Sequence, residues 1–179
     1  MSIIKPLVGK RVILRCAEEK DAAFTLAIRN DPKLTEYIPK VDVSLEEQKK
    51  WIASQQKRLD SCFMVYENLN GICKGTLSFY DIDTENKICE LGRYISCGNA
   101  LENVEAVILL LDYIYDNGFE QIILNNDIRN KKIINFWRKF GAELFDTVDM
   151  GSWTAAQYRL HKSDYELQRS AVASLLKRG

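Results

Sequence analysis

The chain has 179 residues, of which 46% are hydrophobic and 28% are charged, and these are the proportions of a globular domain with a full apolar core. Its 25 basic and 25 acidic side chains cancel, which argues against nucleic-acid and membrane-surface partners, because those need a concentrated basic face. Five cysteines without paired spacing and one histidine, His161, cannot complete a zinc cluster, so we expect no metal and reduced thiols in a cytoplasmic protein. No stretch approaches the roughly 20 apolar residues of a membrane span.

The first third of the chain predicts one strand and two helices. The strand covers 11–16, "RVILRC". Apolar residues at helical spacing follow in "EEKDAAFTLAIRND", and this helix is expected to end before Pro32. After an irregular loop around Pro39, Ser44 and Glu47 have the spacing of a capping box, which predicts a second helix over 44–59.

The middle of the chain indicates three successive strands, at 62–67, 71–82 and 86–96, and Asn70-Gly71 is a strong hairpin signal between the first two. A short polar elbow then leads into a long apolar helix at about 103–117, which ends at Asn117-Gly118. The rest of the chain predicts a strand at 120–126, a helix at 130–140, strands at 142–148 and 152–161, and a last helix at 163–177.

This order, β-α-α-β-β-β-α-β-α-β-β-α, predicts a mixed sheet whose helical connections cover its faces. The strand–helix–strand unit over 86–126 supplies a parallel pair of strands within that sheet. No segment rich in proline, glycine or serine divides the sequence, so we expect one domain over 1–162 followed by a C-terminal helix over 163–179.

The elbow before the long helix is "SCGNALEN", at 96–103. Unpaired N–H groups and aligned peptide dipoles place about half a positive charge at a helix N-terminus, which favours a bound anion. Only Gly98 permits unusual backbone angles freely, and Asn99 with Glu102 has the pattern of a capping box. Two interpretations follow: a phosphate-binding turn, or a helix that is capped by its own acidic first turn, which includes Glu105.

Three segments, taken in order, resemble the Gcn5-related N-acetyltransferase (GNAT) superfamily and in particular its ribosomal-protein N-terminal acetyltransferase branch. They are "LRCAEEKDAAFTLAIRNDPKLTEYI", "ELGRYIS" and "NKKIINFWRKFGAEL", and the likeness spans about residues 10–160. The stretch "GRYISCGNALENVEAVILLLDYIY" is similar to acetyltransferases of nucleotide-linked amino sugars. The resemblance implies an α+β fold with a twisted mixed sheet of six to seven strands, helices on both faces, and a splay between the fourth and fifth strands.

The resemblance also implies acetyl-CoA as co-substrate, with its diphosphate at the elbow and its pantetheine arm along the free edge of strand 86–96. Asn130 matches a family asparagine that contacts the cofactor, and it equally suits the N-cap of the next helix. Arg129, Lys131 and Lys132 would supply cations beside the acidic elbow. The implied cofactor-binding residues are Ile95, Ser96, Cys97, Gly98, Asn99, Ala100, Leu101, Glu102, Asn103, Val104, Asn130, Lys131 and Trp137.

Glu90 matches the strand-four glutamate that often acts as general base in this family, and its structural alternative is an ion pair with a lysine such as Lys87. Trp137 stands where the family often has a tyrosine acid, and an indole N–H releases no proton at useful pH. The departing thiolate would then be protonated by water or by a hydroxyl such as that of Tyr94 or Tyr158.

Acceptor selection is expected in the loop 31–43 and the helices beside it, with Asn30, Tyr37 and Trp51 as substrate-contacting candidates. Aromatic residues of this kind more commonly anchor a loop. The resemblance implies direct acetyl transfer to a primary amine, on a nucleotide-linked amino sugar or, alternatively, on a protein N-terminus. Because of Trp137 and the glycine-poor elbow, a non-catalytic acyl-CoA-binding module is a further hypothesis. We expect a monomer or a homodimer.

Overall fold

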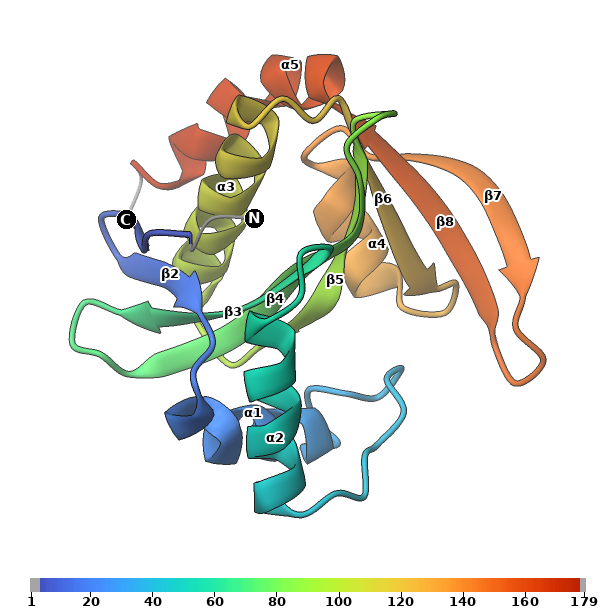
Figure 1. Cartoon of the computed structure of the whole chain (residues 1–179). Coiled ribbons are helices and arrows are strands. Elements are labelled where there is room, and N and C mark those ends of the chain that lie inside the picture. Colours follow the sequence, from blue (N-terminus) through green and yellow to red (C-terminus); the bar gives the residue numbers. More distant parts are fainter. Residues whose placement is uncertain (1–3, 178–179) are drawn as a thin grey trace.

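The computed structural model describes residues 4–177, which form one eight-stranded mixed sheet flanked by five α-helices (Figure 1). The predicted order of elements is confirmed, with two short additions near the N-terminus. The bounds are β1 Leu7–Val8, β2 Val12–Cys16, a 3-10 turn Glu19–Asp21, α1 Ala22–Asn30, α2 Leu45–Gln56, β3 Ser61–Asn68, β4 Cys73–Asp83, β5 Ile88–Ser96, α3 Ala100–Asp116, β6 Gln121–Asp127, α4 Lys131–Arg138, β7 Glu143–Asp149, β8 Thr154–His161 and α5 Lys162–Leu175.

The strands lie in the order β1-β2-β3-β4-β5-β6-β8-β7, and β5 and β6 form the expected parallel pair. The sheet has eight strands where six to seven were predicted, because β1 is added at one edge. This strand is two residues long and pairs Leu7 with Leu14, so it is too short to give an alternating pattern in the sequence.

Two apolar clusters occupy the two faces of the sheet. Successive residues of β3 alternate between them, as the pleat of a strand requires: Met64 belongs to the larger cluster and Val65 to the smaller one. The larger cluster takes side chains from α3, α4 and α5, whereas the smaller one packs α1 and α2 against β3. Tyr165 of α5 lies in the larger cluster with its ring 5.3 Å from that of Tyr115, so the C-terminal helix shares the domain core.

Local sequence signals set several element boundaries as predicted. The Ser44 hydroxyl accepts the backbone N–H of Glu47, whose carboxylate accepts the N–H of Ser44, so the capping box begins α2. Gly71 has a φ of 76° in the β3–β4 hairpin, a left-handed conformation that suits glycine. Helix α3 begins at Ala100, three residues before the predicted start, because Asn99 caps it.

A buried carboxylate joins α3 to the turn between β1 and β2. Glu105 is 5% exposed, and it accepts backbone N–H groups from three residues of that turn. The donors and distances are Lys10 at 3.1 Å, Arg11 at 2.6 Å and Val12 at 2.9 Å. This acidic side chain of the first helical turns is therefore bound by the fold itself.

No helix within residues 4–177 is both long and apolar enough to cross a membrane. The same part of the chain contains no group of three or more His, Cys, Asp or Glu side chains arranged to hold a metal ion. All five cysteines are free thiols. Cys62 and Cys89 are buried as core residues, whereas Cys97 in the elbow is exposed.

Candidate active site

The predicted splay lies between β5 and β6, which are the fourth and fifth strands of the predicted order because β1 was not predicted. The two strands pair only at three positions, and the last pair is Glu90 with Ile123. Beyond it, β5 continues beside β4, while β6 continues beside β8 through Asp127. Figure 1 shows β6, β8 and β7 diverging from the rest of the sheet. The wedge that opens leaves backbone groups on the facing edges of β5 and β6 without a strand partner among the described residues.

Glu90 lies at the apex of this wedge. Its carboxylate accepts the hydroxyl of Tyr80 at 2.5 Å and the side-chain amide of Asn125 at 2.8 Å. Asn125 is itself held by Gln157, whose amide donates to its Oδ1 at 2.8 Å. The pairing of Glu90 with Lys87 is not formed: the Lys87 ammonium lies 3.9 Å from Glu120. Glu90 is therefore oriented by neutral groups, and within residues 4–177 it forms no ion pair.

Tyr94, the other predicted catalytic residue, lies on the opposite face of β5 from Glu90. Its ring stacks on Phe136 of α4 with centroids 5.7 Å apart, and it meets Trp137 edge-on at 5.8 Å. Burial raises the pKa of the Tyr94 hydroxyl. Trp137 is 2% exposed and is a wall of the core on this side of the wedge.

The elbow is capped by its own side chains. Asn99 Oδ1 accepts the backbone N–H groups of Leu101 at 2.9 Å and Glu102 at 3.0 Å, and the Glu102 carboxylate accepts the N–H of Asn99 at 2.8 Å. These contacts are those of the self-capped helix, one of the two structures that the sequence predicted. A diphosphate at this helix end would have to displace the Glu102 carboxylate, which is only 9% exposed as a residue.

A second network lies beneath the elbow. The hydroxyls of Tyr66 and Ser96 both donate to Asn103 Oδ1, at 2.7 and 2.6 Å, and they lie 2.6 Å from each other. The backbone N–H of Gly98 donates to the Ser96 hydroxyl at 3.1 Å. The start of α3 is thus fixed to β3 and β5, which sets the position of the elbow relative to the wedge.

The other predicted cofactor residues follow the same arc of chain. Ala100 and Leu101 form the first turn of α3, Val104 packs against the larger apolar cluster, and Ile95 faces the other side of β5. The Cys97 N–H donates to the Lys74 carbonyl at 2.9 Å. The arc 95–104 is therefore continuous with the wedge, but its N–H donors are largely engaged within the protein.

The neighbouring helix α4 begins with Asn130 as its N-cap, because the side-chain oxygen accepts the N–H of Ile133 at 3.2 Å. Lys131 is exposed. The prediction of three available cations here is wrong for Arg129, whose guanidinium is bound to the 6%-exposed Asp127 through contacts of 2.9 and 2.6 Å.

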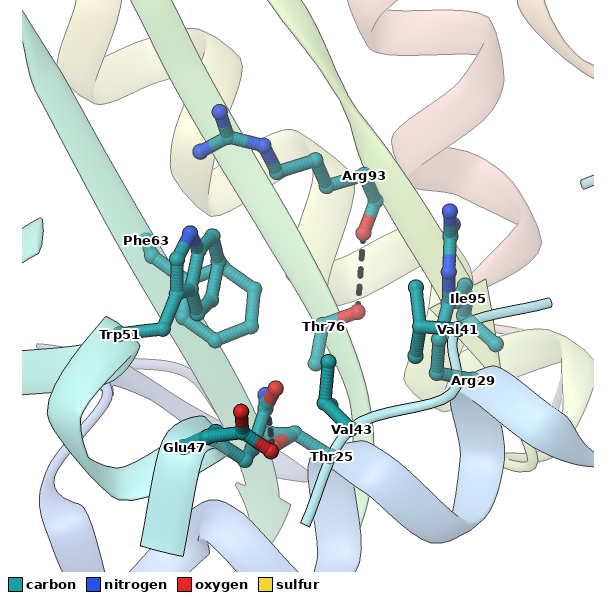
Figure 2. Close-up of a pocket in the computed structure, with 11 residues that line it drawn as sticks. Thr25, Arg29, Val41, Val43, Glu47, Trp51, Phe63, Thr76, Arg93 and Ile95 are labelled. Carbon is teal, nitrogen blue, oxygen red and sulfur yellow. Dashed lines mark hydrogen bonds between the residues drawn. The ribbon is translucent and has the colours of Figure 1, made fainter. Parts of the chain in front are cut away.

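A cavity of about 310 Å³ lies on the α1–α2 face of the sheet, next to the wedge (Figure 2). Its floor is formed by β3, β4 and β5, its walls by α1 and α2, and its cover by the loop between them. The lining residues are Thr25, Arg29, Val41, Val43, Glu47, Gln48, Trp51, Phe63, Thr76, Arg93 and Ile95. Trp51, which meets Phe63 edge-on at 4.9 Å, is the one predicted substrate residue among them.

The two other predicted substrate residues hold the loop 31–43. Asn30 Oδ1 accepts the backbone N–H of Val41 at 3.1 Å, which fixes the cover of the cavity to the end of α1. The ring of Tyr37 lies under the guanidinium of Arg129 at 5.8 Å and is not part of the lining. Tyr37 therefore links the loop to the far side of the wedge.

Sequence reasoning missed both arginines of the cavity and both partners of Glu90. Arg93 projects into the cavity because β5 has a bulge there: Ser78 pairs with Gly92 and Thr76 with Ile95, so one residue of β4 opposes two of β5. Arg93 has a φ of 51°, unusual for a side-chain-bearing residue. No sequence signal marks such a bulge, although the short spacing from Glu90 to Arg93 could have drawn attention to it.

The wedge fits an extended chain that is rich in amides. Such a chain can pair with the free edges of β5 and β6 as an added strand. Asn126, in the unpaired half of β6, has a buried side-chain nitrogen that finds no hydrogen-bond acceptor within residues 4–177. An amide carbonyl of a bound pantetheine arm would satisfy it, because a buried donor without a partner is costly.

Comparisons with known proteins agree with this geometry. A family model described as "Acetyltransferase (GNAT) domain" matches residues 11–143. The structure of apo FdhC, described as a nucleotide-linked sugar GNAT, is 26% identical with a TM-score of 0.83, covering 96% of this chain and 98% of that one. A sequence search of curated proteins finds no significant match.

Two further structures share the fold at lower identity. A GCN5-related N-acetyltransferase from Brucella melitensis is 16% identical with a TM-score of 0.79, covering 96% of this chain and 85% of that one. A variant of the spermidine N-acetyltransferase SpeG from Vibrio cholerae is 17% identical with a TM-score of 0.74, covering 90% and 99%. The family model matches most of the chain, and the wedge between β5 and β6 agrees with it. The chain therefore belongs to the GNAT acetyltransferase family and is an acyltransferase.

Proposed function

We propose that this enzyme transfers an acetyl group from acetyl-CoA to the primary amine of a nucleotide-linked amino sugar. The observation that carries the proposal is the position of Glu90. It lies at the apex of the wedge, and its partner Tyr80 lies 4.5 Å from the guanidinium of Arg93, which lines the cavity. A base at this point has the thioester on one side and the acceptor amine on the other.

In the proposed reaction the amine nitrogen attacks the thioester carbonyl carbon, the C–S bond breaks, and CoA departs as a thiolate. Glu90 accepts the proton that the amine loses, directly or through one water. Tyr80 and Asn125 hold the carboxylate in place through their hydrogen bonds. Backbone N–H groups on the free edge of β5 would polarise the carbonyl oxygen as negative charge develops on it.

The thiolate must then be protonated. Trp137 cannot do this, and water entering the wedge is one source. Tyr94 is the other candidate: burial raises its pKa, so the hydroxyl stays protonated at neutral pH and retains a proton to donate. A raised pKa also makes Tyr94 a weaker acid, and we therefore expect its loss to slow the reaction less than the loss of Glu90.

Two observations support a nucleotide-linked amino sugar over a protein N-terminus. The first is the 26% identity to apo FdhC over 96% of this chain. The second is the shape of the acceptor site, a cavity of about 310 Å³ covered by Val41 and Val43, which is at the lower end of volumes usual for small-molecule sites. A protein N-terminus would need an open path for the rest of its chain.

The test measures release of free CoA thiol with a panel of amines at equal concentration: UDP-linked and dTDP-linked amino sugars, spermidine, and a peptide with a free N-terminus. We expect the highest kcat/KM with a nucleotide-linked amino sugar. In parallel, acetyl-CoA at about 100 times its Kd should stabilise the protein by about 2.7 kcal/mol in a thermal shift. Highest activity on the peptide would establish the protein N-terminal alternative, and absence of any shift with acetyl-CoA would reject the proposed donor.

A further inference from the structure

Two arginines in the acceptor cavity have no carboxylate partner. Neither Arg29 nor Arg93 forms an ion pair within residues 4–177, and both are only partly exposed. Most arginines of the described chain are paired with a carboxylate: Arg11 with Glu105, Arg15 with Asp21 and Glu67, Arg58 with Asp60, Arg129 with Asp127 and Arg169 with Asp112. The cavity thus holds two guanidinium groups without a direct carboxylate contact, in a protein whose formal net charge is zero.

The two arginines come from different elements, and the contacts of Arg93 hold its guanidinium in place. Arg29 projects from the last turn of α1, and Arg93 projects from the β5 bulge. The Arg93 guanidinium lies 4.5 Å from the ring centre of Tyr80 and 5.5 Å from that of Trp51, and its Nη1 donates to Gln55 at 3.2 Å. Figure 2 shows Arg93 extending over the floor toward the side of Trp51 and Phe63, and Arg29 on the opposite side of the cavity, beside Val41 and Ile95.

The two positive charges disfavour each other. Burial lowers the pKa of the Arg29 guanidinium, and the nearby charge of Arg93 lowers it further. Glu47 is the only acidic side chain of the lining, and its Oε2 already accepts the backbone N–H and the hydroxyl of Ser44, both at 2.7 Å. Two partly desolvated cations that lack a direct carboxylate contact are costly unless a ligand supplies an anion.

We propose that Arg29 and Arg93 bind the phosphate groups of the acceptor and thereby select it. This inference rests on the proposed function and adds the residues that determine specificity. Two guanidinium groups present fixed forks of N–H donors, which suit the several oxygens of a diphosphate. The same charges exclude a polycation such as spermidine from the cavity.

The arrangement also connects the proposed phosphate-binding residue Arg93 to the proposed base Glu90. Arg93 stacks on Tyr80, and Tyr80 donates to Glu90, so a phosphate bound at Arg93 lies within two side chains of the proposed base. An amine borne on the sugar next to the diphosphate would then face the wedge from the cavity. Substitution of either arginine should therefore raise KM for the acceptor more than it lowers kcat.

The test uses UDP as the probe, measured by calorimetry with saturating CoA present so that the cofactor site is already occupied. We expect UDP to bind the wild type, uridine to bind at least tenfold more weakly, and both Arg29→Gln and Arg93→Gln to weaken UDP binding at least tenfold. Arg159→Gln is the matched control, because Arg159 is exposed on β8 and has no carboxylate partner within residues 4–177. Equal affinity of the wild type and both cavity variants for UDP would overturn the proposal.

Further measurements distinguish a loss of phosphate binding from a loss of folding and from a failure of the proposed function. Arg93→Lys retains the charge and should recover part of the UDP affinity, and unchanged acetyl-CoA affinity in all variants shows that the fold is intact. Inorganic pyrophosphate that binds as tightly as UDP would assign recognition to the phosphates alone, as proposed. If UDP binding depends on the arginines but no amine is acetylated, the arginine site stands and the proposed reaction fails. If amines are acetylated and UDP does not bind, the reaction stands and the arginine site fails.

Discussion

The substitution Glu90→Gln tests the proposed base with little change in shape. The amide oxygen of glutamine can still accept the Tyr80 hydroxyl, which now lies 2.5 Å from the carboxylate. The amide nitrogen would then face the Asn125 amide, which at present donates to Glu90 at 2.8 Å. Asn125 cannot turn over to accept without losing the hydrogen bond that Gln157 donates to it.

The structural cost of Glu90→Gln is therefore one hydrogen bond, or about 1 kcal/mol of the free energy of unfolding. The kinetic cost should be much larger. Removal of a general base lowers rates by about 10² to 10⁴, which corresponds to about 2.7 to 5.5 kcal/mol of transition-state free energy. Because these two magnitudes differ, stability and rate measurements on one variant separate a structural role from a chemical one.

The assay is the steady-state release of CoA thiol, with acetyl-CoA affinity measured separately by calorimetry. We expect kcat for Glu90→Gln to fall at least 100-fold and acetyl-CoA affinity to stay within a factor of two. The control is Tyr80→Phe, which keeps the carboxylate and removes one orienting hydrogen bond, and its kcat should fall less than that of Glu90→Gln. Equal losses of acetyl-CoA affinity and of kcat in Glu90→Gln would refute the base assignment.

Three further changes test other parts of the structure. Glu105→Ala leaves three backbone N–H groups of the β1–β2 turn without their acceptor, so urea unfolding should show a loss of about 3 kcal/mol or more, and a loss below about 1 kcal/mol would mean that water replaces the carboxylate. Burial raises the pKa of Asp21, but hydrogen bonds and charge from Arg15 lower it more, so it lies below the ordinary value of 3.8. The ionised Asp21 carboxylate therefore adds to the free energy of unfolding above pH 3.8, and this contribution is lost as the pH falls through the lowered pKa. The difference in free energy of unfolding between the wild type and Asp21→Asn should narrow from pH 7 to pH 3. A constant difference would contradict the ion pair. Glu102→Gln removes negative charge from the elbow, so acetyl-CoA should bind severalfold more tightly by calorimetry at a cost of about 0.3–1 kcal/mol of helix stability, and unchanged affinity would place the diphosphate elsewhere.

The position of the proposed base could be predicted from the sequence, whereas its surroundings could not. The segment "ELGRYIS" places Glu90 in a strand that precedes a long helix, and the parallel partner strand follows from the strand–helix–strand order. The hydrogen-bond partners come from two other strands, and Asn125 is 35 positions away. Nothing in the local pattern indicates which polar residue of β6 will face Glu90, because that depends on where the two strands separate.

For the elbow, the sequence left two structures open, and the fold distinguishes between them. Its sequence predicted both a phosphate-binding turn and a self-capped helix, because the same orphan N–H groups attract either an anion or the side chains of Asn99 and Glu102. The structure has the self-capped form. The distinction between Glu102, which lies at the helix end, and Glu105, which is bound to the β1–β2 turn, required the tertiary contacts.

The elements and their order could be predicted from local signals, since capping boxes, hairpin turns and apolar periodicity act over a few residues and each has a local physical cause. The splayed pair of strands was indicated through resemblance. That Arg29 and Arg93 share a cavity is a property of the folded chain alone, since one projects from a helix and the other from a strand bulge 64 positions later. A charge cluster of this kind has no sequence period, because it forms only when the sheet has twisted, the bulge has turned one side chain over, and the helices have closed over that face.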